Sequence, residues 1–407
     1  MKSLVVILMM FGALQVSAHN ILSPLVKTLQ VYVGDDWKEI PLLRKGDGDV
    51  LNVSFDLLTH QYHRLTYSIE HMEYDWTPSS QLMESDYIIG TNNNPIEDYD
   101  LSRNTNTLYT HYLLEIPNER VQVKLSGNYR LTIKDEDDGD NIVATVDFMV
   151  FDNQMAAGIG VTSNTDIDIN KNHQQAFLTV NYSGVKVNNP REQIHTVVMQ
   201  NGINGLKVTD AKPDIIKADG MEWKHVKELI FDAGNEYHKF EILSTDHVSY
   251  GIDDIKWDGK NWHAFPLIDN PRPNYIYDED ANGAFFIRNS DDLENDLASE
   301  YMMVNYRMKS PEYAGYEVFV NGNWTNGQQD EYLMTYDKAS GMYKAQILQK
   351  QGYYNYRYMM KDSGGNVMNV PSQGSFYETE NGYVLLVYYK EQGGRYDQLV
   401  GFAELLE

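Results

Sequence analysis

The chain contains no cysteine. It therefore has no disulfide, no thiolate metal site, no cysteine nucleophile and no cysteine that could carry an N-terminal lipid anchor. Basic residues are also scarce, because 33 lysines and arginines stand against 59 aspartates and glutamates and leave a formal net charge of −26. Such an acidic chain is a poor partner for nucleic acid or anionic lipid, and we expect neither as a ligand.

The N-terminus carries a short apolar run and no long one. Lys2 precedes the apolar residues 4–14, and Val16, Ser17 and Ala18 have the spacing of a signal-peptidase site before His19. The run falls short of the roughly 20 residues that span a bilayer, so a retained membrane anchor is the less favoured alternative. We predict that residues 1–18 are a signal peptide and that the mature chain is periplasmic.

No long segment repeats its apolar residues with a helical period, and only 12 prolines are present, whereas tyrosine occurs 30 times. Apolar residues instead alternate with polar ones, as Leu51, Val53 and Phe55 do, which is the period of a half-buried strand. The same pattern recurs in 121–125 and 129–133. These observations predict an all-β fold of tandem immunoglobulin-like β-sandwich domains.

The length of 407 residues exceeds what one hydrophobic core usually organises, and a polar segment rich in Gly, Asn and Thr at 153–172 is typical of a boundary. We expect an N-terminal sandwich over 19–155, a middle sandwich over 156–298 and a C-terminal, E-set-like sandwich over 299–407. The candidate strands 240–243 and 285–287 fall in the middle sandwich of this division, and 383–389 falls in the last.

Common catalytic motifs are missing. The chain has no Gly-x-Ser-x-Gly elbow, no Gly-x-x-x-x-Gly-Lys phosphate loop and no His-Glu-x-x-His. A glycosidase pair of carboxylates stays open, because the separation of two acids is a property of the fold. We expect no enzyme, no catalytic residue, no cofactor and no metal ligand, and the binding residues remain unknown at this stage.

Asp278, Asp280, Asn282 and Gly283 match the first half of a calcium loop, in which alternate oxygen ligands surround the ion. The second half of the calcium-loop motif is not matched, because Asn289 occupies the position where a bidentate carboxylate should close the site. A hairpin turn built from Asx residues is the favoured interpretation.

Three histidines are candidate zinc ligands: His60, His63 and His71. His60 and His63 do not share a strand face, however, and no glutamate completes a hydrolase motif. His71 is placed on one strand face with Tyr67 and Ile69, where a single histidine is more often a packed residue than a ligand.

The C-terminal part resembles the glycogen-binding-like immunoglobulin modules attached to amylases and kinases. The likeness covers about fifty residues and includes 316–326 (YEVFVNGNWTN), Met334 and 350–358 (KQGYYNYRY). In that pattern the first aromatic is mostly core and a second, three positions later, stacks on sugar rings. Trp324 takes the first place and Gly327 the second, so the sugar platform is missing and a structural sandwich is favoured over glycan binding.

Across nearly the whole mature chain the sequence resembles the type IX secretion system plug protein family of Bacteroidota. The segments that carry the resemblance are 69–78 (IEHMEYDWTP), 109–113 (YTHYL), 125–131 (LSGNYRL), 200–202 (QNG), 233–237 (AGNEY), 282–283 (NG), 350–356 (KQGYYNY) and 395–399 (RYDQL). One departure is Met72, where many relatives are expected to have cysteine. His71 and Trp76 are interpreted as packed residues of the first sandwich.

The resemblance implies a non-catalytic periplasmic protein that docks on the outer-membrane translocon barrel and closes its periplasmic opening. It also implies a monomer when free, which reaches the outer membrane only through its protein partner. The chain is not expected to be cargo of the same pathway, because its acidic end (LVGFAELLE) lacks the basic close of a sorting domain. The alternative function is that of a secreted carbohydrate-binding β-sandwich protein.

Overall fold

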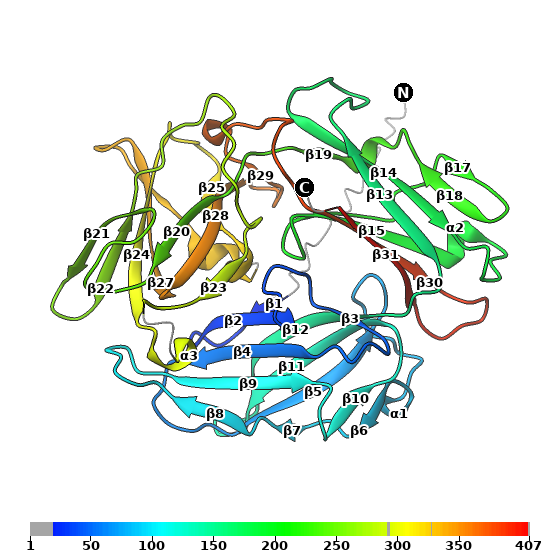
Figure 1. The fold of residues 1–407 in the computed structure, drawn as a ribbon, viewed down its shortest axis with the longest axis horizontal. Coiled ribbons are helices and arrows are strands. Elements are labelled where there is room, and N and C mark those ends of the chain that lie inside the picture. The colour runs from blue at the N-terminus through cyan, green and yellow to red at the C-terminus, as the bar shows by residue number, and fades with distance from the viewer. Residues whose placement is uncertain (1–18, 291–293, 327, 406–407) are drawn as a thin grey trace, which may run out of the picture.

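The computed structural model describes residues 19–290, 294–326 and 328–405. The expected signal peptide 1–18 and Gly327 lie outside these residues. Three β-sandwiches are arranged around a common centre, as the three lobes of Figure 1 show. The predicted all-β fold of tandem sandwiches is therefore confirmed.

The first sandwich is formed by residues 19–152 and encloses one large apolar core between two sheets, which are antiparallel except for one parallel pair, that of β3 with β12. One sheet contains β7 (Asn94–Pro95), β5 (Leu65–Met72), β11 (Gly127–Asp135), β12 (Asn141–Phe151) and β1 (His19–Ile21), with β3 (Leu42–Arg44) beside β12. The other contains β2 (Val26–Val33), β4 (Leu51–Leu57), β9 (Thr110–Ile116) and β8 (Asp98–Leu101). A two-stranded ribbon of β6 (Ile88–Gly90) and β10 (Val121–Val123) follows the short helix α1 (Glu84–Tyr87).

The alternation seen in the sequence determines which side chains fill this core. Leu51, Val53 and Phe55 on β4 are fully buried, and Tyr129 pairs with His71 on one side and Phe148 on the other. Stacking of Phe55 on Tyr112 and of Tyr129 on Phe148 adds directional aromatic contacts.

The second sandwich combines the start of the middle region with the end of the chain. One sheet contains β17 (Ile215–Ile216), β18 (Gly220–Trp223), β14 (His173–Asn181) and β13 (Ala156–Thr162), with β19 (Ile230–Asp232) also on β14. The other contains β16 (Leu206–Thr209), β15 (Ile194–Gln200), β30 (Tyr383–Tyr389) and β31 (Gln398–Leu405). The short helices α2 (Pro190–Gln193) and η1 (Lys227–Leu229) lie in its connections.

The third sandwich is formed by the chain between those two parts. One sheet contains β20 (His238–Ile242), β28 (Gly352–Lys361) and β23 (Phe285–Ile287), with β25 (Glu317–Asn321) and β29 (Val367–Asn369) also on β28. The other contains β21 (Ile252–Trp257), β22 (Trp262–Pro266), β24 (Tyr301–Lys309), β27 (Met342–Lys350) and β26 (Thr335–Asp337). The short helices are α3 (Asn295–Ala298), η2 (Asn323–Thr325), η3 (Gln329–Tyr332) and η4 (Pro371–Gln373).

Strand pairing corrects the expected boundary at 298. Strand β30 pairs with β15 along its whole length, while β20 and β23 pair with β28. The last two strands of the chain therefore complete the second sandwich, where the red β30 and β31 lie among the green strands of Figure 1. The third sandwich is an insertion within the second, and the sequence division missed it because strand alternation says nothing about which distant strand is the partner.

Among the described residues, the α-helices α1, α2 and α3 have four residues each. In the part of the chain that the structure describes, no helix is long and apolar enough to cross a membrane.

Candidate docking surface

A buried ion pair joins the first sandwich to the third. The Asp56 carboxylate on β4 lies 2.7 Å from the Lys350 ammonium at the end of β27, and their side chains are 0% and 1% exposed. The Tyr301 hydroxyl and the His111 Nδ1 atom, each at 2.7 Å, also contact this carboxylate. The Lys350 ammonium lies 4.1 Å from the centre of the Tyr109 ring, which adds a cation–π contact.

The groups around Asp56 stabilise the ionised form of its carboxyl group. Burial alone raises the pKa of Asp56, but the Lys350 ammonium and the His111 imidazole outweigh it and hold the pKa below its usual value. Asp56 is therefore an anion in the folded protein at neutral pH, although no water reaches it. A second carboxylate, that of Glu300, accepts the backbone N–H groups of Asn106 and Thr107 from the first sandwich.

An apolar contact joins the first sandwich to the second. Strand β30 is buried along all seven residues, because its two faces serve different cores. Tyr383, Leu385, Val387 and Tyr389 fill the second sandwich. Val384, Leu386 and Tyr388 instead pack against Leu42 and Met149 of the first.

Polar contacts complete this interface. The Tyr388 hydroxyl donates to Asn128 Oδ1 at 2.7 Å, and the Lys390 ammonium lies 3.0 Å from the Glu73 carboxylate. The Tyr74 ring stacks on His195 at 3.9 Å. Because apolar packing and buried polar contacts both hold the sandwiches, we expect the three to move as one body.

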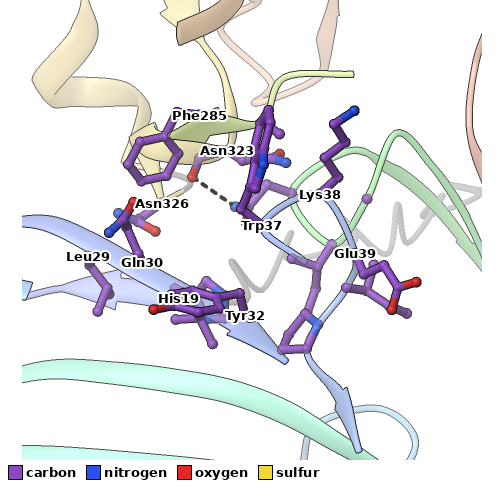
Figure 2. Close-up of a pocket in the computed structure, with 17 residues that line it drawn as sticks. His19, Leu29, Gln30, Tyr32, Trp37, Lys38, Glu39, Phe285, Asn323 and Asn326 are labelled. Atoms are coloured by element: carbon purple, nitrogen blue, oxygen red, sulfur yellow. Dashed lines mark hydrogen bonds between the residues drawn. The ribbon is translucent and has the colours of Figure 1, made fainter. Parts of the chain in front are cut away.

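All three sandwiches meet at the loop that follows β2. Figure 2 shows Trp37, Lys38 and Glu39 of this loop with Phe285, Asn323 and Asn326 of the third sandwich above strand β2. Gly202 and Asn204 of the second sandwich close the small pocket of about 60 Å³, and the Asn204 amide donates to the Asn323 carbonyl at 3.4 Å. At this junction, residues of all three sandwiches lie next to one another.

The three histidines considered for zinc binding occupy separate environments. The His60 ring contacts the Ser102 carbonyl, His63 contacts Asp135 and His71 contacts Ser79. The His71 pair resembles the serine–histidine part of a hydrolase site, but the two residues are only 1% and 6% exposed. No substrate can reach them, so His71 is a packed residue; Trp76 likewise packs at the interface with the second sandwich.

The buried His71 makes the stability of the first sandwich depend on pH. Its Nε2 donates to the Ser126 carbonyl and its Nδ1 accepts from Ser79, which satisfies the neutral imidazole. Burial lowers the pKa of His71 from its usual value to about 4. Since the unfolded chain binds the proton more tightly, this histidine lowers stability as pH falls from about 6.5 to about 4, by about 3 kcal/mol at about 1.4 kcal/mol per pKa unit.

We therefore expect the free energy of unfolding, measured with urea, to fall more between pH 7 and pH 4.5 for the wild type than for the His71→Gln variant. The glutamine amide can still donate to Ser126 but takes up no proton. Equal losses in the two proteins would contradict the buried neutral state of His71.

One group of described side chains has the spacing of metal ligands. His63, Asp135 and Asp137 each place one ligand atom within 4.8 Å of the others. The hydrogen bonds already present explain this arrangement, because Asp135 accepts from the Asp137 amide and Asp137 accepts from the Arg64 amide. These contacts close the turn between β11 and β12, and we assign no metal to it.

In segment 278–283, which resembles half of a calcium loop, the carboxylate oxygens contact protein groups. Asp278 pairs with the Lys239 ammonium at 2.6 Å, and Asp280 accepts the backbone N–H groups of Asn282 and Tyr237. The expected Asx turn is present. It does not form a hairpin, however, because it leads into β23, whose partner is β28.

Trp324 occupies a core position in the third sandwich. Its ring is 7% exposed, and its indole N–H donates to the Asn355 carbonyl at 2.9 Å. A ring held in this way offers no face to a sugar, and the position expected to carry the sugar platform, Gly327, lies outside the described residues.

Comparison with known proteins relates these features to a family. The model of the "Type 9 secretion system plug protein 1st domain" matches residues 26–152, which are the first sandwich without its first strand, β1. A crystal structure of a hypothetical protein from Parabacteroides merdae is 32% identical and superposes with a TM-score of 0.91, over 96% of this chain and 99% of that one. The chain belongs to the type 9 secretion system plug protein family. The resemblance found in the sequence is confirmed.

The plug family is a structural family with no indicated catalytic activity, and its role in the secretion apparatus implies a location in the periplasm or envelope. Alignments with an enterococcal surface protein (7% identity, 98% of this chain and 97% of that one) and Escherichia coli alpha-2-macroglobulin (11%, 93% and 31%) have TM-scores of 0.17 and 0.15 and carry no argument. No curated protein matches the chain.

Proposed function

We propose that this protein is a non-catalytic periplasmic plug that docks on the outer-membrane barrel of the type 9 secretion translocon and closes its periplasmic opening. The observation that carries the proposal is membership in the plug family, with a likeness that extends over all three sandwiches. An outer-membrane barrel of up to ~36 strands encloses a wide lumen, and such a lumen needs a cover when no cargo occupies it.

The arrangement of the sandwiches supports this role. A cover must be broad and must keep its shape, and both requirements are met by three sandwiches joined through the Asp56–Lys350 pair and the two-faced strand β30. A reversible contact also needs exposed apolar anchors within a polar rim. Exposed aromatic side chains are present on the third sandwich, including Tyr250, Tyr277 and Phe286.

Capture of the partner tests the docking step. We expect the tagged full-length protein to retain the translocon barrel from detergent extracts of its own organism, and a strain that lacks the protein to admit more of a large hydrophilic dye through the outer membrane. If the barrel is not retained and the dye enters both strains equally, the proposed function is wrong.

A further inference from the structure

A cleft at the junction of the three sandwiches is lined by acidic residues from all of them. Its volume is about 470 Å³. The carboxylates that line it are Asp36, Glu39, Glu236, Glu279, Asp280, Glu380 and Glu404, and the lining contains a single lysine, Lys38. The loop with Lys38 and Glu39, shown in Figure 2, forms the wall contributed by the first sandwich.

The described residues do not neutralise these acids. None of the seven carboxylates forms an ion pair within the described ranges, although most lysines and arginines elsewhere on the surface do. Glu236 is only 2% exposed and accepts hydrogen bonds from Tyr275 and from the Glu380 backbone. Asn282 also lines the cleft, and its buried Oδ1 atom has no hydrogen-bond partner among the residues that the structure describes. The cleft thus carries negative charge that no described lysine or arginine pairs with, although backbone N–H groups and a tyrosine hydroxyl donate to Glu236 and Asp280.

The titration of the acids agrees with this lack of countercharge. Burial and the neighbouring Glu236 raise the pKa of Asp280 to about 7, even though two backbone N–H groups and Lys239 act against the rise. Burial followed by repulsion from Glu39 raises the pKa of Glu404, with Arg44 acting in the opposite direction. A bound cation would relieve this repulsion.

An aromatic groove of about 550 Å³ adjoins the cleft. Trp37, Tyr250, Phe286 and Tyr353 line it, and Lys38, Glu279, Asp280 and Ala281 line both the groove and the cleft. The Trp37 ring lies 5.6 Å from Phe286, and Tyr250 and Phe286 are 57% and 39% exposed. The groove also contains Lys239 and Arg288, which pair with Asp278 and Glu241, and the Lys38 and Lys239 ammonium groups lie 5.3 Å and 5.8 Å from the centres of the Trp37 and Tyr250 rings. An exposed aromatic surface beside carboxylates without ion pairs is still unusual for a surface that contacts only water.

We propose that the cleft and groove together bind an extended segment of a partner protein in which lysine or arginine side chains alternate with apolar ones. The basic side chains enter the acidic cleft, where carboxylates accept their hydrogen bonds. The apolar side chains cover the aromatic rings of the groove. Charge complementarity selects this occupant, because an acidic or neutral segment would leave the carboxylates unpaired.

The assignment rests on the proposed function in one respect, namely that the partner is the translocon barrel. Contact with all three sandwiches at one point would then fix the orientation of the plug on the barrel. Binding at the rim would also depend on salt, since charged groups that face solvent are screened at high ionic strength.

The test is a binding titration with a fluorescein-labelled peptide, Lys-Leu-Arg-Leu-Lys-Leu, followed by anisotropy at 150 mM salt. The Glu39→Gln/Glu404→Gln variant removes two cleft charges with little change of shape. The Glu119→Gln/Glu228→Gln variant loses the same net charge at exposed positions outside the cleft and groove. This control is necessary because any protein with a net charge of −26 attracts a cationic peptide weakly.

We expect the cleft variant to bind at least about tenfold more weakly than the wild type, as the loss of charge-assisted hydrogen bonds implies, and the control variant to bind like the wild type. Equal affinities for the two variants would overturn the assignment. In the capture experiment, a wild type that retains the barrel and a cleft variant that retains it equally well would reject this site but keep the plug function. Cleft-dependent peptide binding, without barrel capture and with equal dye entry into the two strains, would reject the plug function and keep the site.

Discussion

Replacing Lys350 by methionine is expected to destabilise the protein by about 3–5 kcal/mol, because the substitution leaves the Asp56 carboxylate buried without its main countercharge. Methionine retains the length and most of the packing of the lysine stem. The loss therefore reports on the charge, and it should appear as a lower urea midpoint together with faster hydrogen exchange in β4 and β27. These strands come from different sandwiches, so both should respond.

A surface lysine provides the matched control. Lys344 lies on the same strand as Lys350, β27, and pairs with Asp337 of β26, but the side chains of Lys344 and Asp337 are 46% and 36% exposed. The Lys344→Met variant should lose at most about 1 kcal/mol, since exposed ion pairs contribute little. The double variant Asp56→Asn/Lys350→Met should regain part of the loss of the single variant, because no unpaired charge remains. Equal, small effects of the two lysine substitutions would show that the sandwiches are held together by other contacts.

The sequence predicted the strands well where one face of a sheet is buried. Leu51, Val53 and Phe55 face the core as their alternation indicates. Asp56 was missed, because it occupies a position expected to face solvent, and only the third sandwich, whose Lys350 is 294 residues away in sequence, makes that face an interior. A local pattern does not contain such information.

The sequence of strand β30 indicates a strand that is buried on both faces. Its sequence YVLLVYY is apolar throughout, which is typical of a strand buried on both faces rather than one at the edge of a final domain. That pattern could have indicated a strand between two cores. Which cores they are, and the pairing with β15, depends on the insertion of the third sandwich and is visible only in the structure.

The acidic cleft could not be predicted for a similar reason. Asp36, Glu236 and Glu404 belong to separate parts of a chain with 59 acids, and nothing in their neighbours distinguishes them from solvated surface residues. They become a site only because the three sandwiches converge. The interpretation of His71 as a packed residue, by contrast, needed only the strand pattern around it and agrees with its burial, whereas Trp76 lies in the turn after β5 and is only partly buried.

The most direct test of the plug function is the current through the translocon barrel. The barrel, purified without its periplasmic partners, would be placed in a planar lipid bilayer, and the full-length protein would be added to the side of the periplasmic opening. We expect nearly all of the current to disappear, because a rigid body of three sandwiches covers the opening of the lumen. Serum albumin, another acidic protein, should leave the current unchanged.

Addition from the opposite side should also have no effect, since the docking site faces the periplasm. The Lys350→Met variant, used at a temperature where it has lost its sandwich contacts, should close fewer barrels than the wild type at the same concentration. A barrel that conducts equally with and without the folded wild-type protein on its periplasmic side would contradict the proposed function.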